Sequence, residues 1–134
     1  MKGLELQISA TTVFCDDIRR EDTGKAILIG VYVEDMIPST LPSRFSLSIW
    51  TKFFGISSGN HPFKVEIDFP GGHKFEWPGE VDISDPNVPT SLFAAGIPAV
   101  VKEAGLIKAQ LYISGKNIDA GELLVREPQP PAKE

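Results

Sequence analysis

Apolar and polar residues alternate with a period of two along this sequence, and helical periodicity is hard to find. Residues 64–69 alternate cleanly and meet Pro70-Gly71-Gly72, a strong hairpin signal, before residues 73–77 return. Residues 106–114 alternate as well, and the side chains expected to face inward are Ile107, Ala109, Leu111 and Ile113. Because successive side chains of a strand point to opposite faces, this pattern predicts an all-β protein.

The remaining strands follow from the same alternation and from the turn residues between the runs. We expect extended segments at residues 4–14, 25–34, 45–54, 64–69, 73–77, 81–83, 106–114 and 123–125. The parity of the first segment changes near Thr11-Thr12, which predicts a bulge or bend there. Residues 91–104 are ambiguous: their alanines would tolerate a helix, but Gly96 and Pro98 interrupt it, so we expect short extended pieces and at most one helical turn.

Seven to nine short antiparallel strands favour a β-sandwich, with a small barrel as the alternative. A chain of 134 residues with 42% apolar residues suits one domain with a core of its own. We expect this domain to cover residues 1–127. Three prolines follow within residues 128–134, which predicts a flexible, proline-rich tail.

Composition excludes several classes of protein. The formal net charge of −5 argues against broad electrostatic binding to nucleic acid or to a membrane. The amino terminus lacks the unbroken apolar stretch of a signal peptide, and no run approaches the roughly 20 apolar residues of a membrane helix. Cys15 is the only cysteine, so an internal disulfide is impossible. Together these features predict a cytoplasmic protein.

Catalytic signatures are absent from the sequence. It contains no phosphate-binding glycine loop, no nucleophile elbow and no zinc-binding helix motif. His61 and His73 lie in or beside the turns of the middle hairpin, and nothing in the sequence brings them to Cys15. We therefore interpret Cys15 as a buried structural residue and expect no catalytic residues, metal or cofactor. A small hydrolase stays an alternative if a polar pocket joins a histidine to Cys15 or to a carboxylate.

The strand predicted at residues 25–34 is apolar on both of its faces. One face carries Ile27, Ile29, Val31 and Val33, and the other carries Ala26, Leu28, Gly30 and Tyr32. In the strand at residues 45–54, Phe45, Leu47, Ile49 and Phe53 suit the interior, and Trp50 and Phe54 have the outward parity.

An apolar outer surface results if these two strands are neighbours in one sheet. It would consist of Leu28, Tyr32, Trp50 and Phe54, and exposed patches of this kind usually contact another molecule. The hypothesis is a non-enzymatic interaction or structural module whose partner is protein, a second copy of itself. The alternative is that residues 35–44 or 91–104 fold over this face.

The most unusual local run is residues 15–25, with four acidic and three basic side chains. It is expected to be a loop or hairpin connection, and Gly24 suits a turn with positive φ. One interpretation is a network of salt bridges that orders the turn; its candidate members are Asp16, Asp17, Arg19, Glu21, Asp22 and Lys25. The alternative is a ligand- or metal-binding sandwich with a cation site on the acidic loop at residues 16–22.

Residues at both ends of the chain resemble a known family. Phe14-Cys15-Asp16-Asp17-Ile18-Arg19, followed by Glu21, Gly24-Lys25 and Ile29-Gly30-Val31-Tyr32, resembles the amino-terminal signature of a bacterial and phage family of domains of unknown function. Residues 104–116 look like the closing hairpin of an immunoglobulin-like sandwich. The resemblance implies that fold and a bacterial or prophage origin, and it implies no catalytic activity.

Overall fold

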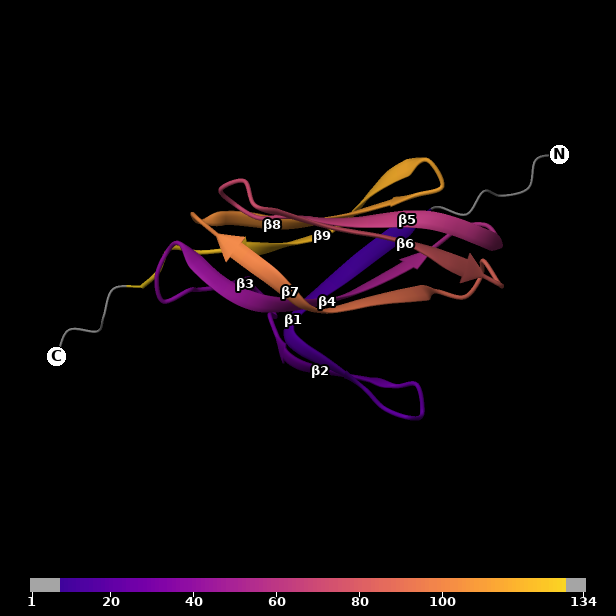
Figure 1. Ribbon diagram of the computed structural model, residues 1–134, viewed down its shortest axis with the longest axis horizontal. Helices are drawn as coiled ribbons and strands as arrows, with labels where there is room; N and C mark the ends of the chain where they lie inside the picture. Colours follow the sequence, from indigo (N-terminus) through magenta and orange to yellow (C-terminus); the bar gives the residue numbers. More distant parts are fainter. Residues whose placement is uncertain (1–7, 130–134) are drawn as a thin grey trace.

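The computed structural model describes residues 8–129, and these form nine strands in two packed sheets (Figure 1). The strands are β1 (Ser9–Arg20), β2 (Ala26–Val31), β3 (Asp35–Met36), β4 (Ser43–Phe54), β5 (Gly59–Asp68), β6 (Lys74–Ile83), β7 (Thr90–Val101), β8 (Gly105–Ile113) and β9 (Lys116–Val125). The expected all-β sandwich is therefore confirmed. The part of the first predicted strand before residue 8 and most of the predicted tail lie outside the described residues.

The first sheet has four strands in the order β2-β1-β4-β7, and the second has five in the order β3-β9-β8-β5-β6. Neighbouring strands are antiparallel except for β3, which pairs parallel to β9. The middle hairpin expected from Pro70-Gly71-Gly72 is β5–β6. The segment expected near residues 81–83 is the end of β6 and not a separate strand.

The core lies between the two sheets and follows the predicted parity closely. The inward residues expected in β8, namely Ile107, Ala109, Leu111 and Ile113, are all buried. In β4, Leu47, Ile49 and Phe53 are buried as expected, and they join the same cluster. Burying such apolar side chains is the main favourable contribution to folding.

No bulge occurs at Thr11-Thr12, so that expectation is wrong. β1 pairs with β4 in unbroken register from Ser9 to Cys15. Thr12 points inward, and its hydroxyl lies 2.9 Å from that of Thr51 on β4, so the two groups satisfy each other. Because the two hydroxyls satisfy each other, Thr12 can face the core although it is polar. The alternation of inward and outward residues therefore needs no shift at Thr11-Thr12.

Residues 91–104 also differ from the expectation, because most of them belong to one long strand, β7. The pairing of β7 with β4 shifts between Leu47 and Ile49, and Gly96 has a φ of +73° close to this irregularity. Gly96 and Pro98 are therefore accommodated within an edge strand. Pro98 cannot donate to a ladder, which is tolerated at the edge of a sheet.

The first hairpin extends well beyond the sandwich (Figure 1). β1 pairs with β4 up to Cys15 and with β2 from Cys15 to Arg20, so its second half leaves the sheet together with β2. We call the hairpin of residues 15–31 the arm. The charged run, expected to be a loop or hairpin connection, is a hairpin: residues 15–20 belong to β1, and the turn covers residues 21–25.

Candidate functional site

The outward face of the arm is apolar along β2. Ile27, Ile29 and Val31 are 46%, 44% and 43% exposed, and Val33, just beyond the strand, is 86% exposed. We call these four residues the β2 row. Since large apolar side chains in a domain of this size are mostly buried, the exposed row on a projecting hairpin is the candidate site.

The strand order separates the four residues that were expected to form one apolar patch. β1 lies between β2 and β4, so Leu28 and Tyr32 are not on a strand adjacent to that of Trp50 and Phe54. All four side chains are half-buried. The more exposed face of β2 is the opposite one, which carries the β2 row. The sequence of β1 contains a clue to which face of β2 is exposed. In the register of β1 with β2, Ile27 lies beside Arg19 and Ile29 beside Asp17, so this face of β2 adjoins charged side chains.

Trp50 packs on the outer side of the first sheet against β7. Its ring stacks on Phe93 with centroids 6.0 Å apart and planes 9° from parallel. The guanidinium carbon of Arg20, at the end of the arm, lies 4.5 Å from the centre of the Phe93 ring. The indole N–H of Trp50 is buried without a hydrogen-bond partner among the described residues. Arg20 thus links the arm to this aromatic pair.

The acidic side chains of the arm do not converge. Asp17 forms an ion pair with Arg19 at 2.9 Å and accepts the Ile18 N–H, and Glu21 accepts the Thr23 hydroxyl at 3.3 Å. The Arg19 guanidinium lowers the pKa of Asp17 below its usual value. Asp16 has the opposite parity and points to the other face of the strand. Asp22 and Lys25 lie in the exposed turn.

Asp16 instead fixes the root of the arm. Its carboxylate accepts a hydrogen bond of 2.9 Å from the Tyr32 hydroxyl. Burial, followed by the bond to this carboxylate, raises the pKa of Tyr32 to about 12. Gly30 lies between these residues with a φ of +69°, and a β-carbon there would come within 2.8 Å of the Asp16 carboxyl carbon. The position therefore requires glycine for both conformation and space.

Cys15 is fully buried, as predicted. Its thiol donates weakly to the Ser48 carbonyl at 3.6 Å. Burial and the neighbouring Asp16 and Asp17 raise the pKa of the Cys15 thiol. A raised pKa reduces the thiolate fraction, so this environment is the reverse of what activates a nucleophilic cysteine.

A charged cluster covers the outer side of the second sheet. Glu66 on β5 is only 6% exposed, and Lys64 and Lys74 lie 3.7 and 3.5 Å from its carboxylate. Glu66 and Asp68 raise the pKa of Lys74, and burial followed by the charge of Glu66 raises that of Asp68. Sequence alternation indicated outward residues here, but it gave no sign that one carboxylate would be covered by its neighbours.

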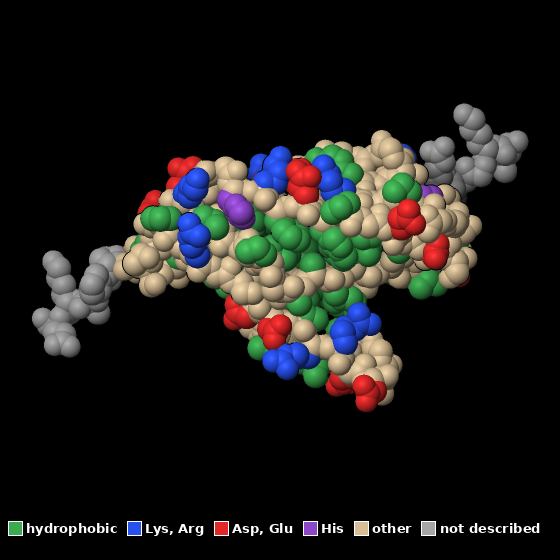
Figure 2. Space-filling model, viewed as in Figure 1, with side chains coloured by type: hydrophobic (Ala, Val, Ile, Leu, Met, Phe, Trp, Pro, Cys, Tyr) green, Lys and Arg blue, Asp and Glu red, His purple; other side chains and the backbone are tan. Residues whose placement is uncertain are grey.

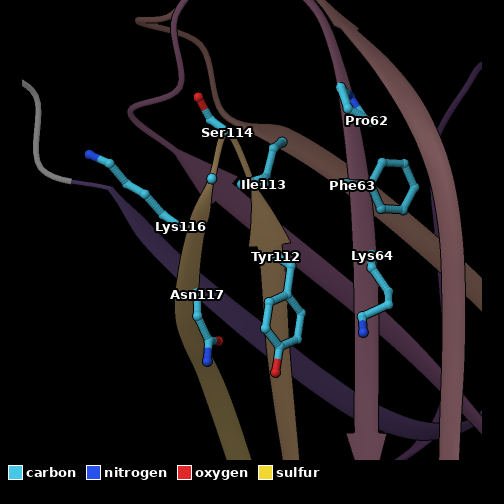
Figure 3. A pocket seen from close by; sticks show the side chains of 9 residues that line it. Pro62, Phe63, Lys64, Tyr112, Ile113, Ser114, Lys116 and Asn117 are labelled. Atoms are coloured by element: carbon cyan, nitrogen blue, oxygen red, sulfur yellow. The ribbon is translucent and has the colours of Figure 1, made fainter.

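A shallow depression of about 510 Å³ lies beside this cluster, near the β8–β9 turn (Figure 3). Tyr112 on β8 lies between Lys64 on β5 and Asn117 on β9, and the Lys64 ammonium is 4.6 Å from the centre of the tyrosine ring. Lys64 is also paired with Glu66 and Glu76. As far as the described residues go, the lining contains no histidine, cysteine or carboxylate. The depression therefore does not join a histidine to Cys15 or to a carboxylate, the arrangement that the hydrolase alternative requires.

A second depression, of about 350 Å³, lies at the root of the arm. Its lining comes from β1, from the chain after β2 and from β9, and includes Val31 and Val33 of the β2 row. In Figure 2, hydrophobic side chains extend from the middle of the sandwich towards the base of the arm, and the arm itself carries acidic and basic groups. The β2 row therefore borders this hollow, whose lining also includes Glu34 and Glu122.

Between residues 8 and 129, no group of three or more His, Cys, Asp and Glu side chains is arranged to hold a metal ion. Nor does this part of the chain contain a helix that could cross a membrane. Comparisons with protein-family models, with curated proteins and with solved structures found no match. The family suggested by the residues at both ends is therefore not identified by these comparisons.

Proposed function

We propose that this chain is a non-enzymatic protein-interaction module that self-associates through its arm. The observation that carries the proposal is the β2 row: four isoleucine and valine side chains, all more than two-fifths exposed, on or just beyond a hairpin that leaves the sandwich. Interfaces combine such an apolar centre with a polar rim. Asp17 and Arg19 supply that rim, since they lie opposite Ile29 and Ile27 on the same face.

The proposed contact surface is the β2 row and not the predicted patch of Leu28, Tyr32, Trp50 and Phe54. Trp50 has its aromatic partner in Phe93 within the chain, so it is a weaker candidate for an interface anchor than its outward parity suggested. The partner stays the same, a second copy of the chain. A cation site on residues 16–22 is disfavoured, because Asp16 and Asp17 point to opposite faces and each has its own partner.

The test is sedimentation velocity of the wild type and of Ile29→Lys over a wide range of concentrations. We expect the wild type to sediment increasingly as a dimer, and Ile29→Lys to stay monomeric because a charge in an apolar interface is poorly compensated. The matched control is Val88→Lys, which changes a 56% exposed valine in the β6–β7 loop. Circular dichroism should report the same β content for all three.

Two results would contradict the proposal. A wild type that stays monomeric at all concentrations would rule out self-association. Equal weakening of the dimer by Val88→Lys and Ile29→Lys would show that the arm is not the contact surface.

The immunoglobulin-like topology is part of the proposal, and the strand order supports it. Immunoglobulin sandwiches pair strands A, B and E in one sheet and G, F, C and C′ in the other. Here β1-β4-β7 and β9-β8-β5-β6 follow those two orders. In this interpretation, β2 and the outer half of β1 are an insertion after strand A. A crystal structure in which β1 did not lie beside β4 would refute the assignment.

The proposed setting follows the resemblance of residues 14–32 to the bacterial and phage family. We place the protein in the bacterial cytoplasm, with no nucleic acid, membrane, metal or cofactor among its partners. Fractionation of cells that express the chain from its native gene tests the location. Recovery in the membrane or in a secreted fraction would contradict it.

A further inference from the structure

The open edge of β2 is unlike the other edges of the two sheets. β7 carries Pro98 and an irregularity beside Gly96, β6 carries Pro78 and alternating charged residues, and β3 has only two residues. Prolines, charges and short length are the features that keep edge strands from pairing with other chains. Residues 26–33, by contrast, contain no proline and no charge. β2 is therefore the edge that is left available.

Some backbone N–H and C=O groups of β2 point towards this open edge. The Tyr32 N–H donates to the Phe14 carbonyl at 2.9 Å. The register of β1 with β2 is the same on both sides of Gly30, whose φ of +69° departs from the extended conformation. Antiparallel alternation then directs the N–H and C=O groups of Ile27, Ile29 and Val31 away from β1, towards the open side. These residues also form the exposed side-chain row. The same three residues thus present both unpaired backbone and apolar side chains.

Charges just outside the two ends of β2 favour one direction of pairing. Lys25 precedes the uncharged stretch, and Glu34 follows it. An antiparallel partner of identical sequence would bring Lys25 of each copy near Glu34 of the other, at both ends of the contact. A parallel partner would bring like charges together, which is unfavourable. The segment is thus complementary to itself only in the antiparallel sense.

We propose that two copies of the chain pair their β2 strands antiparallel about a twofold axis at Ile29, which joins their first sheets into one. This inference rests on the proposed self-association and specifies its geometry. With Ile29 on the axis, Ile27 of each copy lies opposite Val31 of the other, and all six side chains share one face. Gly30 lies opposite Leu28, where the absence of a side chain avoids crowding on the other face.

The register is tested by cysteine substitution and mild oxidation of the full chain. Opposite residues in antiparallel strands lie about 4.5–5.5 Å apart between α-carbons, within the range that a disulfide spans. Ile29→Cys should therefore shift from monomer to covalent dimer on a non-reducing gel. Ile27→Cys should not, because its two copies lie four residues apart along the strands, roughly 14 Å at about 3.4 Å per residue. The double variant Ile27→Cys/Val31→Cys should be cross-linked again.

The wild type is the control for Cys15, which is buried and should give no covalent dimer. Sedimentation of each reduced variant checks that it associates like the wild type. A dimer that persists while Ile29→Cys is not cross-linked, or while Ile27→Cys alone is, would overturn the β2 pairing and leave self-association standing. A monomeric wild type would overturn both.

Discussion

Substitution of Gly30 by alanine probes the root of the arm. The φ of +69° puts this residue in the left-handed region, where an L-residue costs about 1–2 kcal/mol. The new β-carbon would also meet the Asp16 side chain, with its carboxyl carbon at 2.8 Å and its β-carbon at 3.1 Å. Asp16 must then rotate away and lose its hydrogen bond from Tyr32, which costs about 0.5–1.5 kcal/mol more. We expect Gly30→Ala to lower the free energy of unfolding by about 2–3 kcal/mol.

The matched control is Gly24→Ala in the turn of the arm. Gly24 has a φ of +89°, and no heavy atom lies within 4 Å of the position that a β-carbon would take there, so only the conformational cost applies. Urea denaturation of both variants, followed by circular dichroism, measures the difference. In an Asp16→Ala background the difference between the two glycine substitutions should shrink, because the carboxyl group is gone and only the β-carbon of residue 16, at 3.1 Å, still meets the new one. The pKa of Tyr32, raised to about 12 in the wild type, should fall in Gly30→Ala.

Equal destabilisation by Gly30→Ala and Gly24→Ala in the presence of Asp16 would refute this reasoning. It would mean that the carboxylate moves without cost and that the Asp16–Tyr32 bond does not hold the arm. A Tyr32 pKa unchanged by Gly30→Ala would lead to the same conclusion from an independent measurement.

Two further predictions concern titration and buried charge. Burial raises the pKa of Cys15, so the unfolded thiol loses its proton first, above about pH 8.5, and the free energy of unfolding should fall as pH rises beyond that value. Urea unfolding at neutral and alkaline pH should show a smaller fall for Cys15→Ala, and an equal fall would contradict the assignment. Glu66→Gln removes the buried charge between Lys64 and Lys74 and should cost about 1–2 kcal/mol, less than a fully buried pair because both lysines are partly exposed. The exposed Glu80→Gln is the control, and an equally small effect of both on thermal unfolding would refute a stabilising role for Glu66.

Much of the fold could be predicted from the sequence, because burial on one face of a strand imposes a period of two. β8 followed the expected parity residue by residue, and the β5–β6 hairpin followed from its proline and glycines. β4 followed the expected parity at Leu47, Ile49 and Phe53, whereas Phe45 is only half-buried and Ser48, on the outward parity, is buried. The prediction failed at Thr12, since alternation treats a threonine as outward and cannot foresee the hydroxyl of Thr51 across the sheet. It failed again over residues 91–104, where an edge strand tolerates a glycine and a proline that an inner strand would not.

The location of the candidate site could not be predicted from the local sequence pattern. β2 is apolar on both faces, so its own residues do not reveal which face is exposed. That choice depends on β1, which separates β2 from β4 and carries the pair out of the sandwich. The charged run at residues 15–25 shows the same limit of prediction. Asp16 and Asp17 lie in a strand, where successive side chains point to opposite faces, so Asp16 bonds to Tyr32 and Asp17 to Arg19.

The sequence by itself determined the class of this protein: one run of short strands, a single cysteine and a charge distribution without a dense acidic or basic cluster. These properties depend on neighbouring residues, and so they can be derived from spacing alone. Only the tertiary structure decided which strands lie side by side, that a hairpin projects from the sandwich and that Ile27, Ile29 and Val31 stay exposed on it. Strand order joins residues that are far apart in the chain, and the burial of a side chain depends on what those distant residues cover.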